Sequence, residues 1–379
     1  MREMTLGERL KRANWLLLGL ALLLAVLGVV CVRVAAVGKP VDYGWQQLRW
    51  VIVGVAACLL TLAVPYMKFV RLRYLLYAAG LCMLVAVLFV GVGGANSNVQ
   101  RWIRVGGFKA QPSEFMKVIM VIVLAGYIRY ETRYRRFRGL AFPFALTLIP
   151  VLLIMRQPDL GTALLLIPLL FVLLYVAGAR PRHLGIVALC GVVAGLLLYF
   201  IPGLMGEYQK NRVRVFLLQD SQDTAILRNL GHQLHNSKTV VGSASAFGEG
   251  TGEEAAEAVQ FLPERHSDFI FPVLLTVFGS VGMTGFLLLY LLFVALLLRT
   301  AVRVREPAGR LLAVGIATLF ACQATINMAM TVGLLPIVGM PLPFLSYGGS
   351  SLLTSFVALG LVLNVGADHP VEFGRGDFD

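Results

Sequence analysis

The sequence predicts an all-α polytopic membrane protein with about ten transmembrane helices and one long extracytoplasmic loop between helices 7 and 8. Of its 379 residues, 58% are hydrophobic and only 14% are charged, and the mean hydropathy is +0.79. A soluble core could not bury that much apolar surface. Apolar runs recur along the whole chain, so we expect one membrane domain over residues 1–379, with the loop at residues 202–268 inside it.

The apolar runs reach or approach the length of a helix that crosses the hydrocarbon layer, about 20 residues. In chain order they begin near Ala13, Arg49, Tyr74, Glu114, Leu140, Leu160, His183, Phe269, Arg310 and Phe344. The first run is long and many follow it, so we interpret it as a retained span and not as a cleaved signal peptide. The 5 cysteines are widely spaced within such runs, which is typical of buried small hydrophobic residues and not of disulfides or metal sites.

Lysine and arginine gather in the links that a ten-span chain places on one side of the membrane. These residues precede the first span or follow the second, fourth and eighth: Arg2, Arg9, Lys11, Arg12, Lys68, Arg71, Arg73, Arg129, Arg133, Arg135, Arg136, Arg138, Arg303, Arg305 and Arg310. Basic links stay in the cytoplasm, so both termini are expected there. The net charge of +13 then reflects topology and contact with anionic membrane lipids, and nucleic acid is not expected as a partner.

The polar segment at residues 202–268 lies outside the cytoplasm in this topology, together with residues 94–112 and 335–343. Long loops in ordered proteins are usually functional or disordered. We therefore expect the active side of the protein to be extracytoplasmic.

Two short motifs mark the starts of spans on that side. Gln111-Pro-Ser-Glu114 is typical of a loop that enters a helix, and Lys117 lies three residues after Glu114, so the two can pair on one helix face. A structural ion pair is favoured, and a buried strut beneath a site is the functional alternative. Asp159 follows a tight turn and can cap the next helix, with a cavity-facing role for Arg156 and Asp159 as the alternative.

The long loop carries a basic and an acidic cluster. Lys210, Arg212 and Arg214 could hold a diphosphate, because guanidinium groups offer paired donors to phosphate oxygens, but a solvated basic face is about equally plausible. The acidic run contains Glu249, Glu253, Glu254 and Glu257. A solvated loop is favoured for it over a divalent cation site.

Glu264, His266 and Asp268 alternate just before an apolar run. An extended backbone would place all three on one face, whereas a helix would align Glu264 with Asp268 alone. A metal triad is a weak option. A shielded Asp268 could instead have a raised pKa and act as a general base, or it could cap the following helix, and these two interpretations are equally supported.

A proline-broken segment, Gly333 to Ser351, precedes the last span. Non-helical backbone at membrane depth must be buried in protein or line a cavity. Packing through its glycines and serines is the default interpretation, and a cavity wall is the functional alternative.

Taken together, these stretches resemble the SEDS family of bacterial cell-wall proteins, the shape, elongation, division and sporulation group that includes RodA and FtsW. The matching stretches are Arg101-Trp-Ile103, Gln111-Pro-Ser-Glu114 with Lys117, Gln157-Pro-Asp-Leu-Gly-Thr162, Phe261-Leu-Pro-Glu264 with His266 and Asp268, and Pro341-Leu-Pro-Phe-Leu-Ser-Tyr-Gly-Gly-Ser-Ser351. The Gln157-Pro-Asp-Leu-Gly-Thr162 turn and the Met340-Pro-Leu-Pro-Phe344 run resemble RodA more than FtsW.

The resemblance implies a peptidoglycan glycosyltransferase in the bacterial cytoplasmic membrane that polymerises lipid II for cell elongation and shape. Asp268 takes the position of the family's essential aspartate, the base for the acceptor's 4-hydroxyl, and undecaprenyl diphosphate would leave with inversion. A class B penicillin-binding protein and the MreB-organised elongation machinery are the implied partners. Magnesium or manganese is a candidate helper with no ligands assigned.

The remaining site residues fall into two groups. Those expected to bind substrate are Arg101, Arg104, Arg212, Arg214, Glu264, His266 and Ser346. Those expected to support the site are Glu114, Lys117 and Asp159.

The chain also departs from the family. Glu253 to Ala258 replaces a Gly-Thr-Gln element, Glu249 replaces a basic residue, and Thr276 and Val277 replace a pair of glutamates. These changes bear on substrate contacts and any metal site, and they leave the base unchanged. A lipid II flippase and a non-catalytic membrane scaffold of the cell-wall machinery are the alternative functions.

Overall fold

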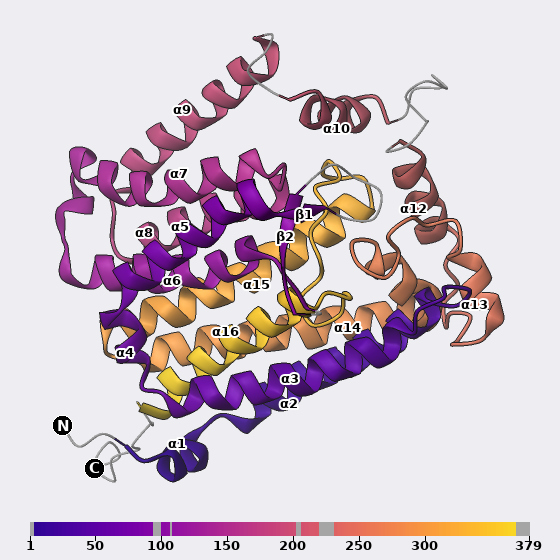
Figure 1. Ribbon diagram of the computed structural model, residues 1–379, viewed down its shortest axis with the longest axis horizontal. Helices are drawn as coiled ribbons and strands as arrows, with labels where there is room; N and C mark the ends of the chain where they lie inside the picture. Colours follow the sequence, from indigo (N-terminus) through magenta and orange to yellow (C-terminus); the bar gives the residue numbers. More distant parts are fainter. Residues whose placement is uncertain (1–3, 94–99, 107, 202–205, 220–230, 369–379) are drawn as a thin grey trace, which may run out of the picture.

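The computed structural model describes residues 4–93, 100–106, 108–201, 206–219 and 231–368, which Figure 1 shows as a ribbon. Arg2 and parts of the predicted extracytoplasmic segments 94–112 and 202–268 lie outside these residues.

Each predicted apolar run holds a long helix in the described part of the chain. They are α2 (Trp15–Ala35), α3 (Tyr43–Ala63), α5 (Arg73–Val90), α6 (Pro112–Tyr130), α7 (Ala141–Arg156), α8 (Leu160–Val176), α9 (Pro181–Phe200), α14 (Ile270–Arg303), α15 (Pro307–Thr331) and α16 (Gly349–Asp368). By length and composition, 7 described helices can cross a membrane, and the apolar stretches in α8 and α9 are shorter. Helix α6 is not among these 7 helices, because it carries three charged residues, Glu114, Lys117 and Arg129. The predicted all-helical polytopic fold is confirmed.

Two helices begin away from the predicted residue. The second span begins at Tyr43 and not near Arg49, because the Asp42 side chain caps it by accepting the N–H of Trp45 at 3.0 Å. The last begins at Gly349 and not near Phe344, where φ is 65° and the backbone cannot continue a helix.

Shorter elements join the spans. They are α1 (Leu6–Arg12), α4 (Tyr66–Arg71), β1 (Val92–Gly93), β2 (Gln100–Val105), β3 (Phe108–Ala110), η1 (Arg133–Arg135), η2 (Phe137–Leu140), α10 (Glu207–Leu217), α12 (His232–Gly242) and α13 (Glu253–Ala258). The strands form an antiparallel sheet in the order β1-β2-β3, with Arg104 opposite Lys109.

The two ends of the bundle differ in composition. Figure 1 shows α1 and α4 toward the left and α12 and α13 on the right. At the first end, Arg9 pairs with Asp368 at 2.9 Å and Arg129 pairs with Glu306 at 2.8 Å. This end holds the basic links, so the positive-inside rule predicts that it faces the cytoplasm.

The proline-broken segment before α16 is buried in the bundle. Phe344 is 1% exposed, and its ring lies 5.3 Å from the rings of Phe320 and Phe356. Gly28 of α2 permits this approach, because a Cβ there would lie 2.7 Å from the Leu345 carbonyl oxygen. Small residues commonly allow such close contact inside membranes.

Helix α14 is broken once along its length. Gly279 has φ 67° and ψ −173°. The backbone groups freed by the break bond to the loop at residues 245–250: Ser280 N donates to Ser245 O at 3.1 Å, and Glu249 N donates to Thr276 O at 2.8 Å. The kink therefore ties this part of the long loop to α14 through backbone hydrogen bonds.

Candidate active site

Asp268 lies in a tight turn that precedes α14. The N–H groups of Ser267 and Asp268 both donate to the Glu264 carbonyl oxygen at 3.1 Å, and Glu264 has φ 49°. The backbone is therefore curled, and the extended arrangement that would put Glu264, His266 and Asp268 on one face is wrong. Glu264 and Asp268 instead belong to the same helical turn.

The Asp268 side chain does not cap the following helix. The cap residue of α14 is Phe269, and no side chain bonds to the free N–H groups there. No hydrogen bond reaches the Asp268 carboxylate from the described residues, and its side chain is half-buried. The capping interpretation is wrong, and the carboxylate is left available for chemistry.

The surroundings of Asp268 make it more basic than an ordinary aspartate. Burial raises its pKa to about 6, the charges of Glu264 and Asp159 add to the rise, and those of Arg212 and Arg101 oppose it. Such a carboxylate is mostly ionised at pH 7 and still accepts a proton readily.

Gly339 forms a wall beside this carboxylate. Its φ is +68°, and a Cβ at this position would lie 3.1 Å from Asp268 Oδ2 and 3.8 Å from Arg212 Nη2. The segment before α16, helix α10 and the Asp268 turn therefore meet at one point. This contact places the proline-broken segment beside Asp268.

Two polar side chains of α15 hold that wall in place. Asn327, fully buried, donates through Nδ2 to Asp268 O at 2.9 Å and to Met340 O at 2.6 Å. Gln323 donates to Pro341 O at 2.8 Å. Sequence reasoning missed both residues, although polar residues four apart in an apolar run share a helix face and were a usable signal.

The predicted pair on α6 is present and continues this support. Lys117 Nζ lies 2.8 Å from Glu114 Oε2, and the two side chains are 6% and 3% exposed. Lys117 also donates to Gln323 Oε1 at 3.1 Å. The chain Glu114, Lys117, Gln323 and Pro341 is the buried strut that the functional alternative described.

Asp159 caps α8 and ties it to α6. Its Oδ1 accepts the N–H of Thr162 at 3.3 Å, and its Oδ2 accepts from Ser113 Oγ at 2.8 Å and from Gln111 Nε2 at 3.0 Å. Arg101 Nε donates to Gln157 O at 3.2 Å and Arg101 Nη2 to Pro158 O. Arg101 is thereby held on this turn.

The predicted cations separate into two pairs. Arg101 and Arg212 both act on the charge of Asp268, and Arg212 is only 6% exposed. Arg104 is exposed and, three residues along the same strand, lies on the opposite face from Arg101. Arg214 is exposed, two helical positions from Arg212. The geometry favours Arg101 and Arg212 over Arg104 and Arg214 as groups near the reacting atoms.

The His266 ring contacts the α2–α3 link and the start of α3. Its Nδ1 lies 3.1 Å from Lys39 Nζ, and its ring centroid lies 4.6 Å from that of Tyr43. Burial and then the charge of Lys39 lower the pKa of His266 to about 4. The ring is neutral at pH 7 and can accept a hydrogen bond from the ammonium group.

Ser346 and Arg265 position the turn. Ser346 Oγ donates to Ser267 O at 2.6 Å and accepts the N–H of Leu342 at 2.7 Å. Arg265 Nε donates to Ala35 O at 2.5 Å. The hydroxyl of Ser346 is thus engaged with the backbone next to Asp268, which favours a positioning role over direct substrate contact.

The described residues hold no group of three or more His, Cys, Asp or Glu side chains that could bind a metal. Glu253, Glu254 and Glu257 are exposed on α13, in agreement with a solvated acidic run. Thr276 and Val277, where relatives were expected to have glutamates, are 5% and 2% exposed in α14. Within the described residues, no set of three such ligands is therefore available to a divalent cation.

Comparison with known proteins gives a consistent picture. The family model of FtsW, RodA and SpoVE, described as "Cell cycle protein", matches residues 11–369. A probable peptidoglycan glycosyltransferase FtsW of Trichlorobacter lovleyi is 36% identical over 85% of this chain and 83% of its own length. Stage V sporulation protein E of Bacillus subtilis is 35% identical over 92% of this chain and 96% of its own length.

Solved structures share the fold. A chain from a peptidoglycan synthase complex, studied for its coordination of polymerization and crosslinking, has a TM-score of 0.80 at 30% identity over 94% of this chain and 98% of that one. The rod shape determining protein RodA of Thermus thermophilus has a TM-score of 0.68 at 29% identity over 95% of this chain and 98% of that one. The curated relatives named here are FtsW and SpoVE, so they do not support the predicted closer likeness to RodA.

Proposed function

The chain belongs to the FtsW, RodA and SpoVE family of cell cycle proteins, and from that premise we propose that it is a peptidoglycan glycosyltransferase that polymerises lipid II. It works in the bacterial cell membrane, with its active end at the outer face. The activity is the one carried in the name of the FtsW relatives.

Asp268 is the general base of the proposed reaction. Its carboxylate takes the proton of the acceptor sugar's 4-hydroxyl, and the hydroxyl oxygen forms a bond to the anomeric carbon of the donor. The bond from that carbon to the diphosphate breaks on the opposite face, so the configuration inverts and the diphosphate leaves with the electron pair. No metal step is needed for this balance of atoms and charge.

Arg101 and Arg212 are the proposed cations for the departing diphosphate. Both are close enough to affect the pKa of Asp268, and guanidinium groups bind phosphate oxygens through paired donors. Fixed charges at the place where negative charge develops lower the barrier without further reorganisation. Arg104, Arg214 and Glu264 remain predicted contacts for the rest of the substrate.

One observation supports this function above the others: a half-buried Asp268 carboxylate, free of hydrogen bonds from described residues, whose pKa is raised by burial to about 6 against the opposing charges of Arg212 and Arg101. Purified protein incubated with lipid II tests it. We expect Asp268→Asn to lose at least about 100-fold in polymer formation, since general bases contribute rate factors of that size. Glu131→Gln is the matched control and should keep full activity, because Glu131 lies at the opposite end and pairs only with the exposed Arg133 among described residues.

Three outcomes separate the alternatives in the same assay. Polymer from Asp268→Asn at the wild-type rate contradicts the proposed base. Translocation of lipid II across vesicles without polymer supports a flippase, and neither activity supports a scaffold.

The cellular role and the partner are also part of the proposal. We propose a class B penicillin-binding protein as the crosslinking partner, because the similar synthase complex couples polymerization with crosslinking. The motifs favour elongation, with the MreB-organised machinery, while the FtsW names of relatives favour division. Depletion in the native host distinguishes the two: rounded cells indicate elongation, and filaments indicate division.

A further inference from the structure

A cluster of arginines lies where the α6–α7 link meets the turn between α8 and α9. It is distant in the fold from Asp268, at the end with the basic links. The cluster, all of whose members are exposed, consists of Arg135, Arg136, Arg138, Arg180 and Arg182. We call it the arginine cluster.

Local contacts hold the two segments of the cluster together. Tyr134 Oη donates to Ala177 O at 3.1 Å, and the rings of Phe137 and His183 meet edge to face at 5.5 Å. A Cβ added to Gly178 would lie 3.9 Å from Arg135 Nη2. The arginines of the two segments are therefore neighbours in space.

The charge of the cluster is not neutralised by the described part of the chain. Neighbouring arginines do have acidic partners: Arg129 pairs with Glu306 at 2.8 Å, and Arg133 with Glu131 at 3.5 Å. Among described residues, the five members of the cluster have neither an ion pair nor a side-chain hydrogen bond. Planar guanidinium groups in this state match the paired oxygens of a phosphate.

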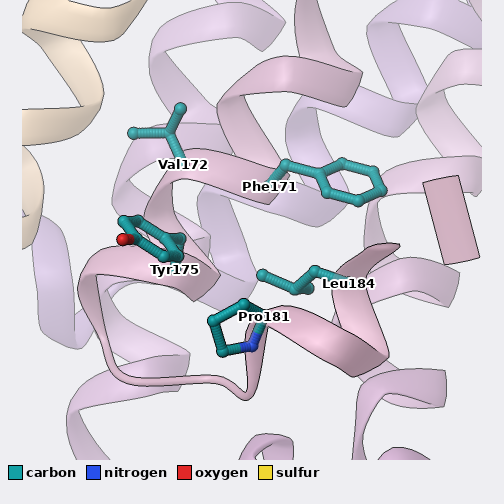
Figure 2. Close-up of a pocket in the computed structure, with 5 residues that line it drawn as sticks. All are labelled: Phe171, Val172, Tyr175, Pro181 and Leu184. Atoms are coloured by element: carbon teal, nitrogen blue, oxygen red, sulfur yellow. The ribbon is translucent and has the colours of Figure 1, made fainter. Parts of the chain in front are cut away.

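A shallow apolar pocket opens next to the cluster. Its lining residues, shown in Figure 2, are Phe171, Val172 and Tyr175 of α8 and Pro181 and Leu184 of α9. Its volume is about 290 Å³. Pro181 lies between Arg180 and Arg182 in the chain, so the rim of the pocket carries members of the cluster. Tyr175 is 62% exposed, as is common for tyrosine at the boundary between lipid tails and headgroups.

We propose that the arginine cluster and this pocket form a binding site for an anionic phospholipid. The phosphate group lies on the arginines and one acyl chain lies between α8 and α9. An anionic phospholipid offers both parts, a phosphate for the arginines and an acyl chain for the apolar lining. Basic pockets between membrane helices are known to suit such headgroups.

The site also explains how α9 is held. In Figure 1, α9 extends away from the bundle, and among the described helices its main contact is with α8. A lipid bound between these two helices would cover apolar surface that α8 alone leaves open.

Native mass spectrometry of the full-length protein in detergent tests the headgroup part. Phosphatidylglycerol and phosphatidylcholine with the same chains are the two probes. We expect retention of phosphatidylglycerol but not phosphatidylcholine, and about 100-fold weaker retention after Arg135→Gln, Arg138→Gln, Arg180→Gln and Arg182→Gln are combined, because each arginine near a headgroup contributes a several-fold factor. The matched control combines Arg71→Gln, Arg303→Gln, Arg305→Gln and Arg310→Gln, which change four other exposed arginines at the same end of the bundle.

A pocket variant tests the chain part. Val172→Trp fills the pocket and keeps every arginine, so it should weaken retention of phosphatidylglycerol, while Val192→Trp on the exposed face of α9 should not. Equal loss in the cluster and control variants would overturn the proposal, as would equal retention of the two lipids. Full competition by glycerol 3-phosphate would also overturn it, because the site would then bind a free anion.

Discussion

At the scale of single residues, the chemistry depends on one carboxylate, that of Asp268, while neighbouring side chains hold the backbone around it. His266 bonds to Lys39. Ser346 and Asn327 bond to backbone carbonyl groups of the turn. Asp268 accepts no hydrogen bond from described residues, and burial raises its pKa from 3.8 to about 6. Its neighbours therefore position the base, and the base is available for substrate.

The raised pKa predicts how polymerisation depends on pH. The ionised carboxylate is the reactive form, so kcat/KM should be flat above pH 7 and fall about tenfold per pH unit below the pKa of about 6. The same shift makes the free energy of unfolding decrease as pH rises from 3.8 to about 6, because the folded protein binds the Asp268 proton more tightly than the unfolded chain does. Initial rates measured from pH 5 to 8, with lipid II binding measured in parallel, check this. A flat profile down to pH 5 would exclude Asp268 as the base.

Asn327 should affect catalysis through the position of Asp268. Asn327→Ala removes the bonds to Asp268 O and Met340 O, and we expect kcat to fall about tenfold or more with KM nearly unchanged, since small misplacements of catalytic groups are costly. Asn364→Ala is the control, because Asn364 is also fully buried but bonds to Arg9 at the other end. Equal losses in kcat for the folded fractions of both variants would assign Asn327 a structural role only.

At the scale of elements, the loop before α16 and the turn before α14 form the site jointly. Gly339→Ala adds a Cβ 3.1 Å from Asp268 Oδ2 at a φ of +68°. The backbone strain costs about 1–2 kcal/mol, and the new methyl group displaces the carboxylate, so polymerisation should fall at least about tenfold.

Gly250→Ala provides the control for that prediction. Gly250 has φ +76° and nothing within 4 Å of an added Cβ, so it carries the same backbone strain without contact to Asp268. Polymerisation rates and melting temperatures of both variants separate strain from displacement. If the two variants lose activity equally, Gly339 has no special place in the site.

Elements were predictable from the sequence where one strong signal decided them. Apolar runs located the spans, because membrane thickness sets helix length, and the residue spacing predicted the Glu114–Lys117 pair. The break at Gly279 was not predictable, because its backbone partners lie in the loop at residues 245–250. The turn at Glu264 closes through local N–H groups, but Ser346, which bonds to it from the segment before α16, lies far along the chain. The spacing of Gln323 and Asn327 indicates a shared polar face of α15, but spacing alone does not identify the Pro341 and Met340 carbonyls as their partners.

At the scale of the whole molecule, the two ends have separate tasks in our proposal. The end with Asp268 carries the chemistry at the outer face of the membrane. The end with the basic links contacts anionic lipids of the cytoplasmic leaflet. The Glu114–Lys117–Gln323 chain connects α6 and α15 beneath the site. The fold is thus a support that keeps a polar site at one boundary of an apolar bundle.

This orientation can be tested in cells with single cysteines in a cysteine-free background. Glu257→Cys on α13 should react with an impermeant maleimide in intact cells or spheroplasts. Arg303→Cys, at the end of α14, should react only after permeabilisation, because basic links stay inside. Both positions are exposed, so access to the protein surface is matched. The opposite labelling pattern would place the proposed site in the cytoplasm.

The most direct test of the central claim measures lipid II affinity and polymer yield on the same preparation of Asp268→Asn. We expect an affinity within about threefold of the wild type, since the amide keeps the shape of the side chain, together with a loss of polymer of at least about 100-fold. That combination assigns Asp268 to proton transfer. Polymer formation near the wild-type rate, or a loss of affinity as large as the loss of polymer, would contradict it.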